Sequence, residues 1–149
     1  MDVLLWSLLG VVAGACIAVQ APINAQLGRD LGFPIAAAAI SFLAGAIVLI
    51  VVGLIVLRVQ GASIAWLAPA PWLYFAGGCL GTVYVTSSIL LTPRIGAAAV
   101  MGLSVAGQLL AGIVLDRIGV LNLAVREISL GRIAGAVLLV AGAVLIRVF

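Results

Sequence analysis

The sequence predicts an all-α integral membrane protein with five transmembrane helices. Hydrophobic residues make up 66% of the 149-residue chain and charged residues only 7%, whereas soluble domains carry about 25% charged residues. The apolar residues also form runs of about 20 between charges and prolines, which is the length that an α-helix needs to cross the hydrocarbon core. A surface of this composition cannot face water, so the expected surroundings are a lipid bilayer.

The first span is predicted at residues 3–27, and it contains an unusual polar stretch, QAPINAQ. Gln20 and Asn24 are four residues apart and therefore share one helix face, with Pro22 between them. An amide without a hydrogen-bond partner in an apolar medium costs roughly 2–7 kcal/mol. Either the helix ends near Asn24, or these amides face protein or a polar cavity. The sequence leaves open whether Gln26 lies in the span or at the interface.

The second and third spans are predicted at residues 35–57 and 71–91. The tight turn GRDLGFP makes the first two spans a hairpin. The longer connection RVQGASIAWLAPAPW carries two tryptophans that suit the interfacial aromatic belt. In the third span Tyr84 and Ser88 share a helix face with two glycines. The polar pattern of the first span is thus repeated in the third.

The fourth and fifth spans are predicted at residues 95–115 and 129–148, and the turn TPRIG makes the third and fourth spans a second hairpin. Ser104 and Gln108 again lie four residues apart. Only 14 residues separate the last two arginines, or roughly 21 Å of helix, so the first of these arginines must snorkel to the interface. The middle of the preceding loop, 122–128, fits a short interfacial helix or a plain polar loop equally well.

Small residues recur four positions apart in every span, which in lipid lets helix backbones approach closely. This pattern favours a compact bundle, and the whole chain, residues 1–149, is predicted to be one transmembrane domain. The small residues are Gly10 and Gly14; Ala37, Ser41 and Gly45; Gly77 and Gly81; Gly102 and Ala106; and Gly131 and Gly135.

Several classes of function are disfavoured by what the sequence contains. There is no histidine, and both cysteines lie in apolar spans, so we expect neither a metal site nor a cofactor. All four acids lie at span ends, which disfavours a mid-membrane proton relay. Without histidine there is no nucleophile–base pair, so an enzyme is not expected. The net charge of +3 is scattered, which argues against nucleic acid as a partner.

Polar residues at depth usually face the bundle interior or a substrate path. The sequence therefore predicts a polar cavity in which a small-molecule substrate binds, with Pro22 as a hinge because proline removes a backbone donor. Alternatively, the same amides only hold neighbouring helices together through hydrogen bonds. Asp116, just past the fourth span, is expected to cap the loop or pair with an arginine. The candidate substrate-binding residues are Gln20, Asn24, Tyr84, Ser88, Ser104 and Gln108.

Three segments carry a resemblance to a known family: QAPINAQL, TPRIGAAAV and above all GQLLAGIVLDRIG, which ends at Gly119. The chain resembles the YdcZ family of small five-span proteins in the drug/metabolite transporter superfamily. Members occur singly, as pairs or fused into ten-span proteins. The resemblance implies a transport-related protein of a bacterial inner membrane that forms one half of a ten-helix inverted repeat. It also points to structural roles for Asp116 and Gly119.

The distribution of arginine predicts an antiparallel homodimer with dual topology. Orientation normally follows a Lys/Arg excess on the cytoplasmic side, and five spans divide the seven arginines four to three. We therefore expect a secondary transporter or facilitator of a small polar metabolite that works by alternating access. The alternatives are a dimeric channel for a small solute or ion and a structural membrane subunit without transport.

Overall fold

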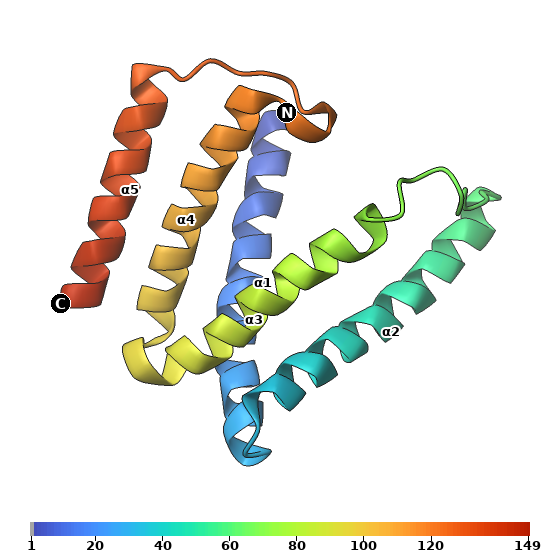
Figure 1. Ribbon diagram of the computed structural model, residues 1–149, viewed down its shortest axis with the longest axis horizontal. Coiled ribbons are helices and arrows are strands. Elements are labelled where there is room, and N and C mark those ends of the chain that lie inside the picture. The colour runs from blue at the N-terminus through green and yellow to red at the C-terminus, as the bar shows by residue number, and fades with distance from the viewer. Residues whose placement is uncertain (1) are drawn as a thin grey trace. The chain divides into compact units, whose positions relative to one another are not determined.

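The computed structural model describes residues 2–149, apart from the side chains of Asp2 and Asn122, and Met1 lies outside the described residues. All five long helices of this part of the chain are apolar enough to cross a membrane, and none of its residues forms a strand. The prediction of an all-helical, five-span chain is confirmed. The elements are α1 (Asp2–Asp30), α2 (Pro34–Gln60), α3 (Leu73–Ile95), α4 (Ala97–Ile118), the short 3-10 helix η1 (Val120–Asn122) and α5 (Leu130–Val148) (Figure 1).

Four helices extend beyond the predicted C-terminal limits of their spans, because charges and prolines do not break them. The possibility that the first helix ends near Asn24 is wrong, since α1 continues to Asp30. In its last turn, Gln26 Nε2 donates to Asp30 Oδ1 at 2.6 Å, and Arg29 donates to Gln26 Oε1. These polar side chains form hydrogen bonds with one another, so the last turn of the helix can include them without leaving these groups unpaired. Gln26 is exposed there.

The turn predicted at TPRIG is shorter than expected, because α3 runs through Pro93. A proline in the last turn of a helix removes only one backbone hydrogen bond. The chain reverses instead at Gly96, which has φ +81 and forms the N-cap of α4. That left-handed φ costs a glycine little and other residues more.

The chain divides into two compact units, Met1–Leu90 and Leu91–Phe149. That all 149 residues form one transmembrane domain stays a prediction. In the first unit, α1 and α2 form a hairpin because Gly32 turns the chain and Pro34 begins α2, where its missing N–H is not needed.

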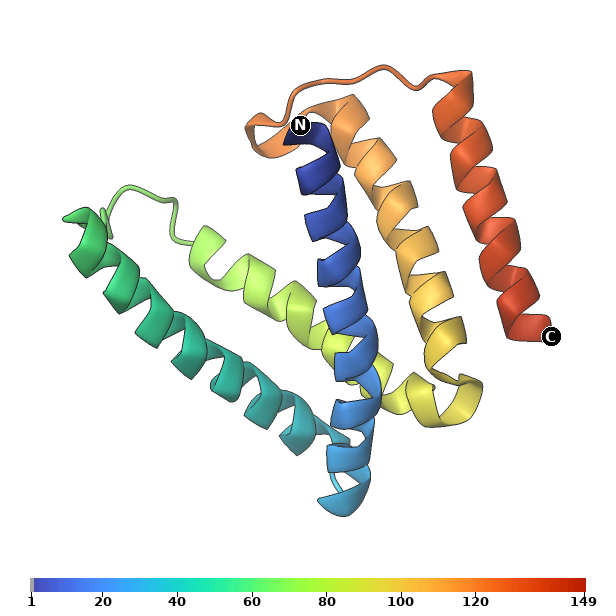
Figure 2. The same ribbon diagram turned by 180° about the vertical axis from the view of Figure 1, so that it is seen from behind.

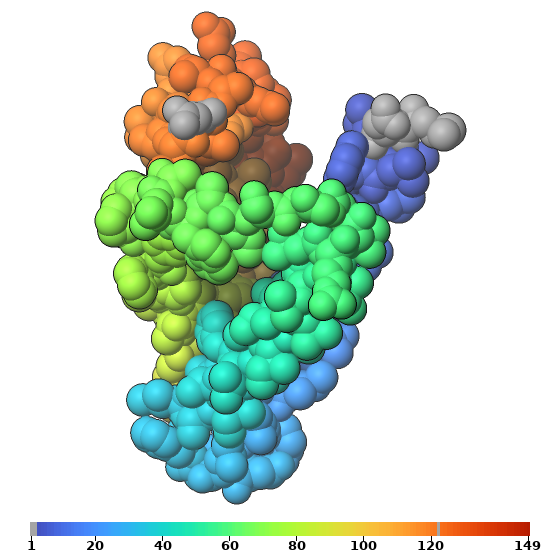
Figure 3. All heavy atoms as spheres, turned by 90° about the vertical axis from the view of Figure 1, so that its right-hand side faces the viewer, coloured from blue at the N-terminus to red at the C-terminus, as the bar shows by residue number. Residues whose placement is uncertain are grey.

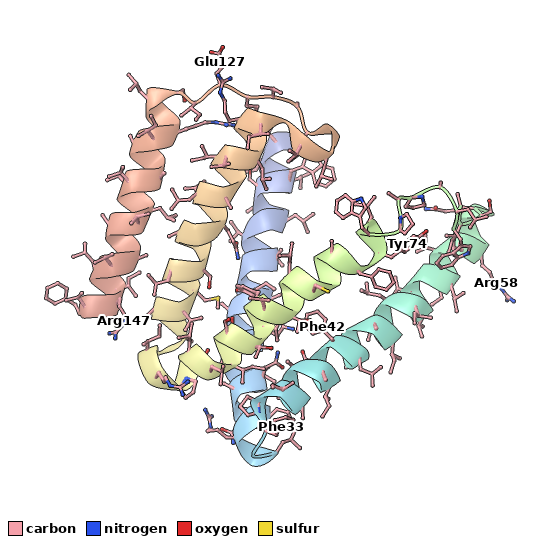
Figure 4. The ribbon with its side chains drawn as sticks, viewed as in Figure 1. Phe33, Phe42, Arg58, Tyr74, Glu127 and Arg147 are labelled. Atoms are coloured by element: carbon pink, nitrogen blue, oxygen red, sulfur yellow. The ribbon has the colours of Figure 1, made fainter. Side chains whose placement is uncertain are left out.

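The helices of the first unit pack most closely near this turn. A Cβ on Gly28 would lie 3.1 Å from Ile89 Cγ2 of α3 and 3.4 Å from Pro34 Cα. Ala37, Ala38 and Ile89 form the buried core beside it. Farther along, the Phe42 ring of α2 lies over Gly81 of α3 (Figure 4).

The rest of α2 is open. Its apolar side chains beyond Phe42 are largely exposed, and in Figure 3 neither α1 nor α3 crosses the side of α2 that faces the viewer. Arg58, at the far end of this helix, projects outward (Figure 4). Such a face requires lipid or another protein surface.

In the second unit α4 and α5 lie side by side (Figures 1 and 2). A Cβ on Gly102 would lie 3.4 Å from Ala143 Cα, so small residues permit this close approach. Gly119 ends α4 with φ +68, and a Cβ there would lie 2.5 Å from Val125 Cγ2. Residues 123–129 have no helical structure, so the 122–128 segment is a loop and not an interfacial helix.

Only some of the small-residue pairs mediate close contact within the described chain. Ala37 is fully buried, and Gly81 and Gly102 lie against neighbouring helices. Within the first unit, by contrast, a Cβ on Gly10 or Gly14 would meet no described atom of α2 or α3 within 4 Å. Close helix approach at these two glycines stays a prediction.

Candidate functional site

Two amides of α1 converge on one hydroxyl of α2. Asn24 Nδ2 donates to Ser41 Oγ at 3.1 Å, and Gln20 Nε2 donates to the same oxygen at 3.3 Å. Asn24 is only 6% exposed and Gln20 is partly buried. The spacing of four residues brings both amides to the same face of α1, as the sequence predicts, and that face meets α2 close to their shared turn.

The predicted residues of the third span join these amides at a small cavity. Gln20, Asn24, Tyr84 and Ser88 line a cavity of about 10 Å³ together with apolar side chains of α1 and α3. This volume is about that of one water molecule. The structure thus brings four of the six candidate substrate-binding residues together in one place.

The two hydroxyl groups of α3 at this cavity, those of Ser88 and Tyr84, differ in their hydrogen bonding. Ser88, which is 5% exposed, donates to the Tyr84 carbonyl at 2.9 Å, the back-bonding that is common for serine in membrane helices. The Tyr84 hydroxyl is fully buried and has no hydrogen-bond partner among the described residues. A buried polar atom without a partner costs about 1–3 kcal/mol, so it requires an explanation.

The cluster lies in the half of the α1–α2 hairpin that is nearer its turn. Asn24 precedes the end of α1 by six residues and Gln20 by ten, which are roughly 9 and 15 Å at 1.5 Å per residue. Ser41 follows the start of α2 by seven residues, or roughly 10 Å. Half the hydrocarbon core is about 15 Å, so a membrane boundary at the α1–α2 turn would place Asn24 and Ser41 on one side of the midplane and Gln20 close to it.

Pro22 lies inside α1, which continues without interruption through it. Its ring cannot donate to the Ala18 carbonyl one turn earlier. The helix is therefore weakened between Gln20 and Asn24, where a hinge would act. That Pro22 serves as a hinge stays a prediction.

Ser104 and Gln108 belong to the second unit, and their participation in the same site stays a prediction. Gln108 is exposed and lines a different cavity of about 370 Å³ between α4 and α5. Asp116 and Arg132 also line this cavity, and Arg132 Nη1 lies 3.1 Å from Asp116 Oδ2.

The Asp116–Arg132 ion pair offsets two unfavourable positions. Asp116 lies in the last turn of α4 and Arg132 in the first turn of α5, so each charge is near the helix end whose partial charge has the same sign. The pair is about one third exposed. The backbone supports it, since Arg126 N donates to the Asp116 carbonyl at 2.9 Å and Ser129 Oγ accepts from Arg132 N.

Replacing Asp116 by asparagine is expected to lower the unfolding temperature and to leave solute affinity within a few-fold. The variant leaves Arg132 at a helix N-terminus without its partner, at a cost of about 1 kcal/mol, or about 2–4 °C. Thermal unfolding of the purified protein measures this. The matched control is Asp30→Asn, at an exposed carboxylate in the last turn of α1. A hundredfold loss of affinity in a stable Asp116→Asn protein would place Asp116 in the solute site.

Ser41 accepts the bonds of both amides, and it is not among the candidate site residues predicted from the sequence, where it belongs to a stripe of small packing residues. One signal in the sequence points to it, because Ser41 is the only hydroxyl residue in the predicted second span.

Comparison with known proteins gives one match. The family model described as "Putative inner membrane exporter, YdcZ" matches residues 5–145, which is nearly the whole chain. No curated protein and no solved structure matches.

Proposed function

The chain belongs to the YdcZ family, and from this membership we propose that it carries a small polar solute across the inner membrane by alternating access. The family is described by the words "Putative inner membrane exporter". The five apolar helices are consistent with a multi-pass protein of that membrane. The site would be formed by Gln20, Asn24, Tyr84 and Ser88, completed by Ser104 and Gln108.

One observation carries this proposal: the buried Tyr84 hydroxyl lies beside two amides at a cavity whose lining, apart from Ser88, is otherwise apolar. Interhelical hydrogen bonds in membranes contribute only about 0.6 kcal/mol each, and the Tyr84 hydroxyl forms none among the described residues, so helix association does not account for these three groups. A solute that forms hydrogen bonds with these three groups would explain why they are buried together. The small size of the cavity fits a transporter whose site opens in turn to each side.

A second copy of the chain would complete the transporter. Within the first unit, α2 and α3 leave the first half of α1 uncovered, with Trp6 71% exposed, and the cavity of a single chain holds no more than a water molecule. We propose an antiparallel homodimer, in which two oppositely oriented chains form a ten-helix inverted repeat. Pro22 would let α1 bend as the cavity opens.

A structural subunit without transport is the second candidate, and one observation favours it. Both amides bond to Ser41, so they connect α1 and α2 directly. In that case, apolar replacements of Gln20 and Asn24 would change stability and nothing else.

The test is a flux assay of purified protein in liposomes over a panel of small polar metabolites. We expect saturable uptake of at least one compound, because a transporter binds its solute on every cycle. Empty liposomes and liposomes with the Asn24→Leu variant serve as controls. Flux that rises linearly with concentration would indicate a channel, and no flux above the empty liposomes would favour the structural subunit.

A further inference from the structure

Resting on the proposed function, we propose a chemical class for the solute: a small uncharged molecule rich in N–H donors, of the amide or urea type. The groups that would bind it are Gln20 Oε1, Asn24 Oδ1 and the Tyr84 hydroxyl, once the cavity, which in the single chain has room for about one water molecule, opens during transport. The donors and acceptors of the cluster that are already in use determine this class.

One N–H group of each amide in the cluster is already used outside the cavity. Gln20 Nε2 and Asn24 Nδ2 both donate to Ser41 Oγ, and Ser41 is not among the residues that line the cavity. Each amide oxygen can accept two hydrogen bonds. Through their engagement with Ser41, the two side chains keep most of their accepting capacity and lose part of their donating capacity.

One further feature increases the surplus of acceptors. Ser88 donates its hydroxyl proton to the Tyr84 carbonyl at 2.9 Å, so that proton is not directed at a ligand. The Tyr84 hydroxyl, which can donate one bond and accept others, is the buried group still without a partner.

A ligand complementary to this site presents several N–H groups and one acceptor for the Tyr84 proton. Primary amides and ureas have this pattern. The lining residues include no charged side chain, and burying an ion without a counter-charge is far more costly than burying a neutral polar group. The nearest charges on α1, Arg29 and Asp30, bond with Gln26 at the helix end. The ligand is therefore neutral.

Four planar probes of equal heavy-atom count separate these features: urea, acetone, acetate and guanidinium. Urea has donors and no charge, acetone has no donor, acetate is an anion, and guanidinium is a cation with donors only. Binding of each probe, carrying an isotope label on carbon, to the protein in lipid nanodiscs is measured by equilibrium dialysis. We expect urea to bind saturably, guanidinium about tenfold or more weaker, and acetone and acetate not at all.

The variant Tyr84→Phe removes only the unpartnered hydroxyl and is expected to weaken urea binding about tenfold. The matched control is Tyr74→Phe, because Tyr74 is exposed and its hydroxyl bonds to the Trp66 carbonyl, outside the cavity. This control should bind urea as the wild type does.

Equal binding of urea and acetone, or of urea and guanidinium, would overturn the donor-rich neutral assignment. Equal effects of the two tyrosine variants would overturn the role of Tyr84. The metabolite panel separates this inference from the proposed function. If urea fails to bind while another solute shows flux that depends on Asn24, the solute class is wrong and the transporter stands. If no solute shows such flux, the proposed function itself fails.

Discussion

Asn24→Leu is expected to abolish solute flux while leaving the chain folded and assembled. Leucine has nearly the same shape as asparagine but removes Oδ1 from the cavity and Nδ2 from Ser41. The lost bond to Ser41 contributes about 0.6 kcal/mol, which is too little to unfold the protein. At the site, by contrast, a polar ligand would face a methyl group, and an unpaired buried polar group typically reduces recognition by 10²-fold or more. Flux in liposomes and size-exclusion chromatography measure the two effects.

Two variants make this test specific. Gln26→Leu changes the same type of group on the same helix, but Gln26 is exposed and bonds only within the last turn, so flux should persist. Ser41→Ala removes the acceptor of both amides without altering the cavity lining, and it should lower flux less than Asn24→Leu does. If Asn24→Leu fails to assemble but its residual folded protein binds solute normally, Asn24 holds helices together and the site assignment is wrong.

The second large effect concerns membrane orientation: wild-type chains are expected to insert both ways up. Five spans place the two termini on opposite sides of the membrane. Four arginines then lie on the N-terminal side and three on the other, and so small a difference gives almost no orientation preference. The four are Arg58, Arg117, Arg126 and Arg132, and the three are Arg29, Arg94 and Arg147.

A fusion at Phe149 to reporters that are active only in the cytoplasm or only outside it measures this orientation. Both reporters should give signal with the wild-type chain. Adding two arginines to the α1–α2 turn reverses the balance to five against four, and adding two to the loop between α4 and α5 raises it to six against three. The second variant should silence one reporter, and the first should shift the ratio the other way. Signal from one side alone in the wild type would exclude the antiparallel dimer and require a parallel dimer or another subunit.

The existence and approximate limits of the helices follow from hydrophobic length alone. What could not be predicted is where each helix ends, because the ends depend on side-chain bonds. Gln26, Arg29 and Asp30 look like a helix stop in the sequence, yet they bond one another inside the last turn of α1. Pro93 likewise looks like a helix stop in the sequence, yet it lies inside α3.

The candidate site could be predicted in part for a related reason. Helix periodicity places Gln20 with Asn24 and Tyr84 with Ser88, since these pairs lie within one helix. Pairing between helices depends on their relative register, which the approach of Gly28 to Pro34 and Ile89 sets in the first unit. No sequence pattern states that register, and for this reason Ser41 was not recognised as the partner of both amides.

The position of the Asn24–Ser41 bond in the half of the hairpin nearer the α1–α2 turn has a consequence for an inverted pair of chains. Each chain would carry its own cluster toward its own α1–α2 turn, and those turns would face opposite compartments. The solute would then bind at two equivalent sites in succession instead of at one central site. In a dimer with one intact and one mutated site, the entry rates from the two compartments would differ, so inward and outward flux would be unequal at the same concentration difference. The symmetric dimer would transport equally well in both directions.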